Sequence, residues 1–378
     1  MILLKVNDRI KLRNIKFFND DKISLKYDSL ASTFAFAMEF DPDNKEHAEL
    51  ACVSHIHECK LIYEHEDKSE ELLITGFMLS QAFQDDAKSH LANISGYTKT
   101  GVLEDCDIPI SIYPLESNGL TFREIVQKVI KPFGDPRKGG FKFIVRSGKA
   151  DSKFTEDQKV DRKIDKSTAP ESKNIKEYLT ELATQKNLVL SHTPEGNLLV
   201  TTANTGGKPL FEIDADRNPG VGYVSMSLVY NGQPMHSEIT VIRQADIDGG
   251  NSAEYTIKNP LVPIVFRPRV VSLTSGDDVT IEEAARNELG KELKAITLNI
   301  VMDRATINKK FITPNNTIIV RNRKLFLYNK TKWFIEGVDF NGDAEKETVT
   351  LTCVLTYVYN NQTPVNPFVD PHKNLPRV

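Results

Sequence analysis

The sequence predicts an α+β fold that is mainly β, with two small antiparallel β-barrels and α/β insertions. Short apolar segments separated by polar turns fill both ends of the chain, a spacing that favours a small barrel or sandwich over a parallel sheet. Helical patterns are confined to the middle of the chain and to one later segment. The length of 378 residues suggests more than one folded unit, since single cores stop growing near about 250 residues.

The composition is that of a soluble protein with enough apolar material for real cores. Hydrophobic residues make up 40% and charged residues 26% of the chain. The net charge of −4 gives no overall attraction to nucleic acid or anionic membranes, and four cysteines do not make a disulfide scaffold. The first residues carry charge from Lys5 onward and lack the apolar core of a signal peptide, and no apolar run predicts a transmembrane helix. We therefore expect a chain that is made in a cytoplasm and stays soluble until it assembles.

Residues 1–110 are expected to form the first β-barrel. In the segment from Ile23 to Phe40, alternate apolar residues near the end fall on one face of a strand, and a turn follows at residues 41–44. The alternating residues are Phe34, Phe36, Met38 and Phe40. Further strands are expected at 60–64, 71–84 and around 90–97.

Residues 111–205 are expected to form an α/β domain of two helices and a hairpin. Thr121 and Glu124 make a capping box for the first helix. The second helix begins at Asn174 and leads into a hairpin that turns at residues 194–197. Helical spacing predicts the buried residues Phe122, Ile125, Val126, Val129 and Ile130 in the first helix, and Ile175, Tyr178, Leu179, Leu182 and Ala183 in the second.

Residues 206–275 and 304–365 are expected to form the second β-barrel, interrupted by a helix–strand unit at residues 276–303. A further capping box at Thr280 and Glu283 opens the inserted helix. This helix is expected to bury Ala284, Ala285, Leu289 and Leu293. The last strand alternates with Val349, Leu351, Cys353, Leu355 and Tyr357 on one face.

Two segments are expected to have no core of their own. Residues 146–173 are rich in charge and Ser with few apolar anchors, which predicts a mobile loop or insertion. Residues 366–378 form the end of a Pro-rich tail, which we expect to be extended and to lie on a partner or in solvent.

The most chemically suggestive stretch is CVSHIHEC, residues 52–59. In a strand, His55, His57 and Cys59 would share one face, and two His at this spacing can grip one metal ion. Cys52 would lie on the other face unless the chain turns, and neither a fourth ligand nor a turn-like knuckle is visible. We favour the plainer interpretation of a barrel strand with polar His at a surface and Cys in the core. No metal site and no cofactor is therefore predicted.

Signatures of catalysis and phosphate binding are absent from the sequence. There is no G-x-S-x-G elbow and no H-E-x-x-H, and the glycines at 206–207 and at 220 and 222 complete no phosphate-binding loop. A pair of carboxylates for hydrolysis has no local signature and stays an open alternative. Residues 304–332 hold eight Lys or Arg and no acid, and the acids between Glu336 and Glu347 favour complementary faces between strands or subunits over phosphate binding.

The order of these segments resembles the baseplate hub proteins of contractile-tailed phages of the Mu type, which are related to late-control D and type VI spike hub domains. The resemblance covers nearly the whole length. Tyr97 stands where that family usually has Arg, and Phe311 where it usually has Trp. The segments similar to family motifs are Ser32–Phe36, Leu72–Phe77, Ile94–Lys99, Leu103–Cys106, Lys131–Gly134, the helix and hairpin at 175–200, Phe266–Pro268 and Phe311–Asn315.

The resemblance implies barrels of the tail-tube type and a non-enzymatic homotrimer. Six barrels would then form a pseudo-sixfold ring that joins a hexameric tail tube to a trimeric central spike, with neighbouring baseplate proteins around it and DNA only passing through its pore. The implied location is the tail baseplate of a virion, assembled in the host cytoplasm. Alternatives are a metal-dependent or cell-wall-degrading tail enzyme, the hub of a phage-derived injection system, or a nucleic-acid-binding module. The tail, the basic stretch and the loop at 146–173 are the expected contact regions.

Overall fold

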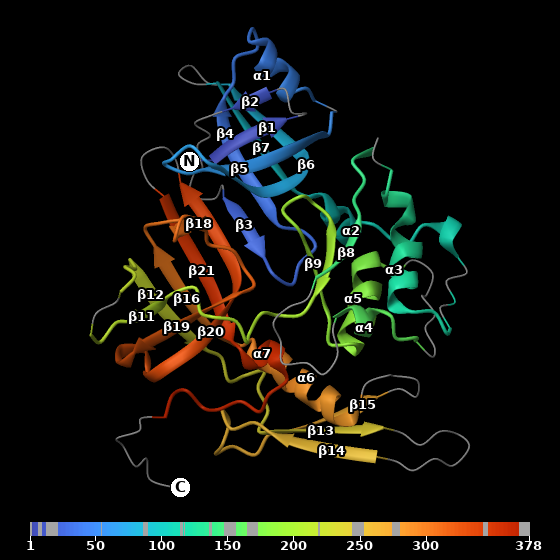
Figure 1. Ribbon diagram of the computed structural model, residues 1–378, viewed down its shortest axis with the longest axis vertical. Coiled ribbons are helices and arrows are strands. Elements are labelled where there is room, and N and C mark those ends of the chain that lie inside the picture. Colours follow the sequence, from blue (N-terminus) through green and yellow to red (C-terminus); the bar gives the residue numbers. More distant parts are fainter. Residues whose placement is uncertain are drawn as a thin grey trace.

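The computed structural model confirms a mainly β fold of the α+β class (Figure 1). Two β modules lie at the top and left of the view, an α/β unit lies at the right, and a small sheet lies below. No helix in the described part of the chain has the length and apolarity that a bilayer crossing requires. The described residues are 2–6, 10–12, 22–53, 55–85, 90–113, 116, 118–135, 138–146, 156–164, 173–217, 220–243, 253–273, 280–342 and 347–369.

The N-terminal module is an antiparallel sheet with one short helix. Its strands β6 and β7 approach each other so closely that side chains are excluded at two facing points. A Cβ added at Gly96 would lie 1.9 Å from the carbonyl oxygen of Phe77, and one at Gly76 would lie 2.1 Å from that of Tyr97. The elements are β1 (Ile2–Val6), β2 (Ile10–Leu12), β3 (Ile23–Lys26), β4 (Thr33–Glu39), α1 (Lys45–Leu50), β5 (His57–Glu64), β6 (Glu70–Asp85) and β7 (His90–Thr98).

The C-terminal module is also mainly antiparallel. Its last long strand confirms the predicted alternation, since Val349, Leu351, Cys353 and Leu355 are fully buried. Tyr357 does not continue this strand, because the chain enters a short helix there. The elements are β11 (Glu212–Asp214), β12 (Ser225–Tyr230), β16 (Ile296–Met302), β17 (Thr306–Ile307), β18 (Lys310–Phe311), β19 (Asn316–Asn322), a 3₁₀ turn (Arg323–Leu325), β20 (Leu327–Gly342), β21 (Glu347–Leu355) and α7 (Tyr357–Asn360).

The two β modules are joined into one sheet, which differs from the expected pair of separately closed barrels. Residues 23–26 of β3 pair with residues 337–340 of β20, so the order runs β12-β16-β21-β20-β3-β4-β7-β6-β5-β1-β2, with β19 beside β20 and β11 beside β19. Within the described residues none of the sheets closes on itself. One hydrophobic core runs through both modules. Alternation along a strand specifies which side chains are buried but not which strand lies beside it, so the sequence left this junction open.

The α/β unit follows the sequence prediction closely. Thr121 accepts a backbone hydrogen bond from Glu124 at 3.2 Å and Glu124 accepts one from Thr121 at 2.8 Å, which completes the predicted capping box. All ten residues predicted to be buried in the two helices are buried. The hairpin turns at Gly196, whose φ of +78° suits glycine. The elements are 3₁₀ turns at Lys99–Gly101, Ile110–Ile112 and Lys131–Phe133, and α2 (Val102–Asp105), α3 (Phe122–Ile130), β8 (Phe143–Val145), α4 (Glu156–Val160), α5 (Ile175–Gln185), β9 (Val189–His192) and β10 (Leu198–Thr201).

Part of the expected mobile loop at residues 146–173 is folded. Helix α4 lies inside it, and Val160 at the end of this helix and Ile164 just after it insert into the core of the α/β unit. The backbone N–H of Ile164 donates to the Leu120 carbonyl at 2.8 Å. The burial of Val160 and Ile164 therefore holds this part of an otherwise polar stretch against the α/β unit. Residues 147–155 and 165–172 of the expected loop lie outside the described residues.

A three-stranded sheet below the main one changes the expected grouping of strands. Residues 238–273 were assigned to the second barrel, but they form β13 (Glu238–Arg243), β14 (Ala253–Lys258) and β15 (Pro268–Leu273), and α6 (Ile281–Leu293) packs on them. Buried Glu292 of α6 accepts hydrogen bonds from the backbone N–H of His236 at 2.8 Å and from Arg269 at 3.1 Å. The strand after α6, β16, belongs to the main sheet, so residues 276–303 are not a separate unit.

The loop between β3 and β4, residues 27–32, ties these parts together. Leu30 is 1% exposed and packs in the core of the α/β unit, although it comes from the N-terminal module. The Glu104 carboxylate accepts the backbone N–H groups of Leu30 and Ala31 at 2.9 and 3.0 Å. Asp28 forms an ion pair with Lys294, just after α6. The loop therefore links the N-terminal module to the α/β unit and to the end of α6.

Candidate interaction surfaces

The segment from Cys52 to Cys59 does not assemble a metal centre from described residues. Cys52 Sγ lies 3.2 Å from His55 Nδ1, in the irregular segment before β5, while His57 begins that strand. Cys59 is buried in the core of the N-terminal module, and this burial raises the pKa of its thiol. No group of three His, Cys, Asp or Glu side chains in the described part of the chain is placed to hold a metal ion. Of the two cysteines in this stretch, only Cys59 lies in the core as expected, and Cys52 is half-buried.

Four of the eight basic side chains at residues 304–332 form ion pairs within the described chain. Arg321 lies 3.3 Å from Asp214 and 3.7 Å from Asp216, and Lys330 forms an ion pair with Glu212. The acids that pair with Arg321 and Lys330 come from β11, which runs parallel to β19, and from the turn after β11. They do not come from the expected segment between Glu336 and Glu347. The sequence did not predict this pairing, because more than a hundred residues separate Arg321 from Asp214.

The described start of the tail lies against its own chain. Phe368 packs edge-on against Tyr230, with 6.0 Å between ring centroids, and Pro364 and Pro367 are buried. Val365 is 67% exposed and Val369 is 45% exposed. The chain makes a turn at Pro367 and Phe368, and residues 370–378 lie outside the described residues. Whether a partner covers the exposed valines stays a prediction.

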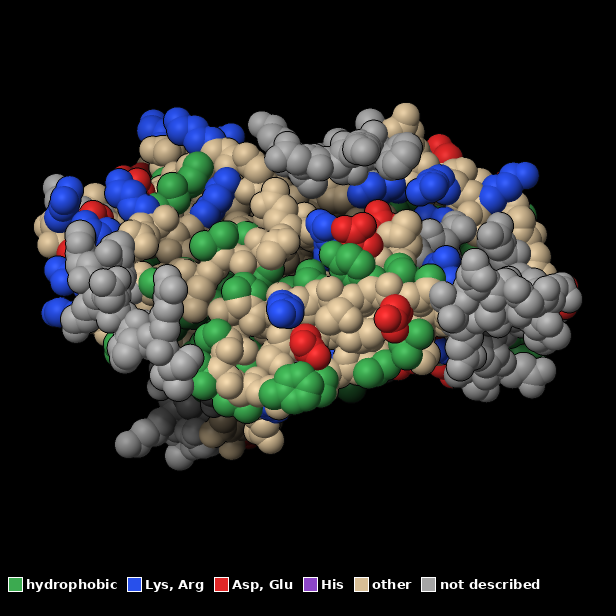
Figure 2. All heavy atoms as spheres, turned by 90° about the horizontal axis from the view of Figure 1, so that it is seen from below, with side chains coloured by type: hydrophobic (Ala, Val, Ile, Leu, Met, Phe, Trp, Pro, Cys, Tyr) green, Lys and Arg blue, Asp and Glu red, His purple; other side chains and the backbone are tan. Residues whose placement is uncertain are grey.

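The outer face of the β13–β15 sheet is an exposed surface on which apolar, polar and charged side chains are mixed (Figure 2). Ile239 and Val241 point into the core, so their neighbours along β13 point outward. On the outer face Thr240 and Thr256 share a hydrogen bond of 2.8 Å, and Val270 is 61% exposed. The register places Glu238, Glu254 and Lys258 on this same outer face, so it mixes charged, polar and apolar side chains.

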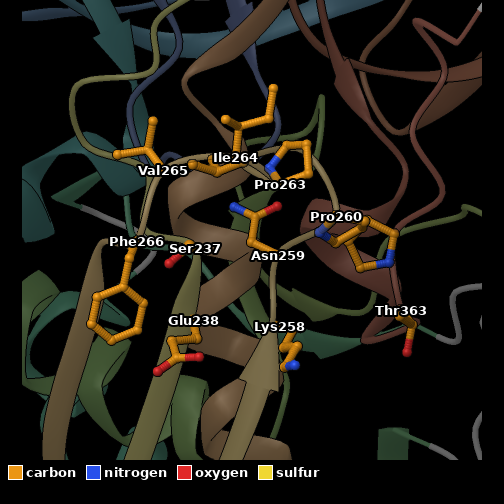
Figure 3. Close-up of a pocket in the computed structure, with 12 residues that line it drawn as sticks. Ser237, Glu238, Lys258, Asn259, Pro260, Pro263, Ile264, Val265, Phe266 and Thr363 are labelled. Atoms are coloured by element: carbon orange, nitrogen blue, oxygen red, sulfur yellow. The ribbon is translucent and has the colours of Figure 1, made fainter. Parts of the chain in front are cut away.

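An open cavity of about 590 Å³ lies at one end of this sheet (Figure 3). The ends of β13 and β14, the loop at residues 259–266 and the start of the tail surround it. The buried side chain of Asn259 accepts the backbone N–H of Leu261 at 3.0 Å and so shapes the loop. Ile264, Val265 and Phe266 are 75%, 56% and 77% exposed. Three consecutive exposed apolar residues form a ledge that a partner surface would cover.

Strand β12 is an edge of the main sheet and carries exposed apolar side chains. It pairs with β16 alone among the described strands. Val229 and Tyr230 are 49% and 46% exposed, and Val224, just before the strand, is 63% exposed. The Tyr230 hydroxyl donates to the Leu261 carbonyl at 2.7 Å. No functional residue was predicted in this strand. Its signal is the absence of any charged residue from 221 to 230.

Comparison with known proteins identifies the fold. No family model matches the chain, and a search of curated proteins finds no relative. Among solved structures, the chain is similar to a 43 kDa tail protein of prophage MuSo2 from Shewanella oneidensis, with 18% identity, a TM-score of 0.72, and coverage of 95% of this chain and 99% of that one. It is also similar to a tail protein of Neisseria meningitidis, with 16% identity, a TM-score of 0.72, and coverage of 96% and 98%.

A more distant likeness reaches the type VI secretion system. An E. coli component of that system, described as structurally similar to the T4 phage tail proteins gp27 and gp5, matches with 8% identity and a TM-score of 0.51. The match covers 96% of this chain and 79% of that one. The fold is therefore that of Mu-type phage tail proteins, and the resemblance seen in the sequence is confirmed at the level of fold.

Proposed function

We propose that this chain is a structural hub protein of a phage tail baseplate. Three copies form a pseudo-sixfold ring that joins a hexameric tail tube to a trimeric central spike. The observation that carries the proposal is the likeness of almost the whole chain, with both β modules, to the 43 kDa prophage tail protein. Two β modules per chain give six in a trimer, which is how a threefold object can match a sixfold one.

The role is one of shape and contact, without turnover. We assign no residue to catalysis and propose no metal or cofactor. The exposed ledge at residues 264–266 and the outer face of the β13–β15 sheet are the surfaces offered to neighbouring proteins. A stable ring needs roughly 2,000 Å² or more buried at each interface. The same ring would serve a phage or a phage-derived injection system.

The test is the mass of the purified full-length chain in solution. A trimer of about 128 kDa, three times 42.6 kDa, is expected by sedimentation equilibrium, alone or after mixing with the spike protein of the same tail. A chain that stays monomeric at high concentration in both conditions contradicts the proposal.

The rival functions make different predictions. A metal-dependent enzyme would contain stoichiometric zinc that His57→Ala removes, and a cell-wall-degrading enzyme would clear peptidoglycan in a zymogram. A nucleic-acid-binding module would retain DNA in a salt-sensitive manner that reversal of Arg323 and Lys324 abolishes. The pairing of Arg321 and Lys330 with acids of the same chain weighs against this last function.

A further inference from the structure

The two β modules repeat one arrangement of four antiparallel strands. In the N-terminal module the order is β4-β7-β6-β5, and in the C-terminal module it is β16-β21-β20-β19. The β19–β20 hairpin therefore corresponds to the β5–β6 hairpin. The connection before β19, residues 303–315, corresponds to the connection before β5, residues 40–56, which contains α1.

Within the chain, the connection of the C-terminal module packs on the hairpin of the N-terminal module. The backbone N–H of Phe311 donates to the Glu71 carboxylate at 2.9 Å, and the ring centroids of Phe311 and Tyr63 lie 5.2 Å apart. Lys309 Nζ lies 3.6 Å from Asp67 in the turn of the β5–β6 hairpin. One module thus offers its hairpin and the other offers its connection.

The charges at this contact are complementary, and the other hairpin and connection carry the reverse signs. Residues 64–71, at the β5–β6 turn, hold five acids and one Lys, and residues 303–315 hold three Lys or Arg and one Asp. Residues 321–330, at the β19–β20 turn, hold four Lys or Arg and no acid, and residues 40–56 hold four acids and one Lys. The β19–β20 turn therefore matches the connection at residues 40–56 by charge.

These two surfaces are exposed and lie in different modules. Helix α1 is at the top and the β19–β20 hairpin at the lower left of Figure 1, so a second copy must supply one of them. The side chains of Arg323 and Lys324 are exposed and form no ion pair with a described residue. The four acids at residues 40–56 are also exposed, and beside them Val53 and Ile56 are 68% and 65% exposed.

The β19–β20 turn presents an aromatic ring in a fixed position. Phe326 has a φ of +60°, a left-handed conformation that is uncommon for a bulky residue, and it is 61% exposed. The Asn322 side chain accepts the backbone N–H of Lys324 at 3.0 Å, and the Phe326 N–H donates to the Arg323 carbonyl at 3.1 Å. These bonds hold the turn in one shape, so a contact through the ring costs little further ordering.

We propose that the β19–β20 turn of one copy docks on the connection at residues 40–56 of a second copy. The contact repeats between copies the one that joins the two modules within a copy. Phe326 packs against Val53 and Ile56, and the basic side chains of the turn face the acids of the connection. The inference rests on the proposed function, because it names a side-chain contact that orders the modules around the ring.

The reversed signs explain how this contact selects its partner. Hairpin and connection are different surfaces, so the contact is heterologous and can close a ring. If two N-terminal modules became neighbours, an acidic connection would meet an acidic β5–β6 turn, and two C-terminal modules would likewise bring basic surfaces together. Like charges oppose both arrangements, whereas the alternating order pairs opposite charges at each junction.

The first test reverses the charge on each side of the contact. Arg323→Glu/Lys324→Glu and Glu46→Lys/Glu49→Lys are each expected to raise the trimer dissociation constant, because like charges then face each other. The expected rise is on the order of tenfold by sedimentation equilibrium at low salt. The four-site variant that combines both reversals restores opposite charges and is expected to return to within about threefold of the wild type.

The matched control makes the same change of charge elsewhere. Lys128→Glu/Lys131→Glu alters exposed side chains at the end of α3 in the α/β unit, and this variant is expected to trimerise like the wild type. Added salt should shrink the effect of both reversals, because it screens exposed charges. Circular dichroism and thermal melting check that each variant is folded.

The second test links the two surfaces directly. Phe326→Cys/Val53→Cys in a Cys52→Ser background is expected to give disulfide-linked trimers under mild oxidation, because a disulfide needs the two residues in contact. The Cys52→Ser change removes the half-buried native thiol beside Val53. Each single cysteine variant in the same background is expected to stay unlinked, which also controls for the native Cys106.

The outcomes separate this inference from the proposed function. If either reversal trimerises like the control, or if the four-site variant does not recover, the docking contact is overturned, while a trimeric wild type leaves the proposed function standing. Links formed by Phe326→Cys alone would indicate a twofold contact between turns and would also overturn it. If a reversal unfolds the chain, the cross-linking result decides. If the wild type stays monomeric with and without its spike, the ring and this contact both fail.

Discussion

Leu30 offers the sharpest test of how the parts of this protein are held together. The side chain belongs to the loop between β3 and β4 but is 1% exposed in the core of the α/β unit. Leu30→Ala removes three buried carbon groups at about 0.8 kcal/mol each and leaves a cavity, so a loss of roughly 3 to 5 kcal/mol is expected. The hydrogen bonds from Leu30 N–H to Glu104, and from Thr98 and Thr100 to the Leu30 carbonyl, do not depend on the side chain.

Urea unfolding can show which part of the protein loses stability in the Leu30→Ala variant. The single Trp, Trp333, is fully buried in the C-terminal module, so its fluorescence reports that module, whereas circular dichroism reports the whole chain. Leu30→Ala is expected to lower the dichroism midpoint more than the fluorescence midpoint, because the α/β unit loses its anchor. Leu79→Ala, at a residue 39% exposed, is the control and should change stability by less than about 0.5 kcal/mol. A Leu30→Ala loss below about 1 kcal/mol, or equal shifts of both midpoints, would refute the anchoring role.

Three further predictions test single features of the fold. His192 contacts Ser32 Oγ at 2.6 Å, and burial lowers the pKa of His192 from 6.5 to about 4. The stability that the neutral imidazole contributes is therefore present above pH 6.5 and lost as pH falls toward 4. Urea midpoints across this range should fall less in His192→Gln than in the wild type. Gly96→Ala would bring a Cβ against Phe77 and is expected to cost roughly 3 kcal/mol or more by thermal melting. Gly222→Ala would place its Cβ in ordinary contact with Arg304 at 3.7 Å and should cost less than about 1 kcal/mol; equal effects would contradict the close approach of β6 and β7. Thr280→Ala removes the cap of α6 and should cost about 1 kcal/mol, and Thr280→Ser should restore most of it; an unchanged midpoint for the alanine variant would argue against the cap.

The local structure could be predicted from the sequence wherever neighbouring residues decide it. The capping box of Thr121 and Glu124 and the spacing of Phe122, Ile125 and Val126 specify a helix and its buried face without help from the rest of the chain. Strand alternation likewise gave the buried face of β21. The assignment of residues 146–173 as a loop failed at α4, because Val160 and Ile164 find their core only after the chain has folded.

The sequence by itself therefore determined the classes of element, their caps and turns, and the side chains that each one buries. The tertiary structure alone decided that β3 pairs with β20, that β11 neutralises Arg321, and that β12 ends as an unprotected edge. These facts depend on which distant strands become neighbours. A periodic pattern of apolar residues is compatible with many such pairings, and only the packing of the whole chain selects one of them.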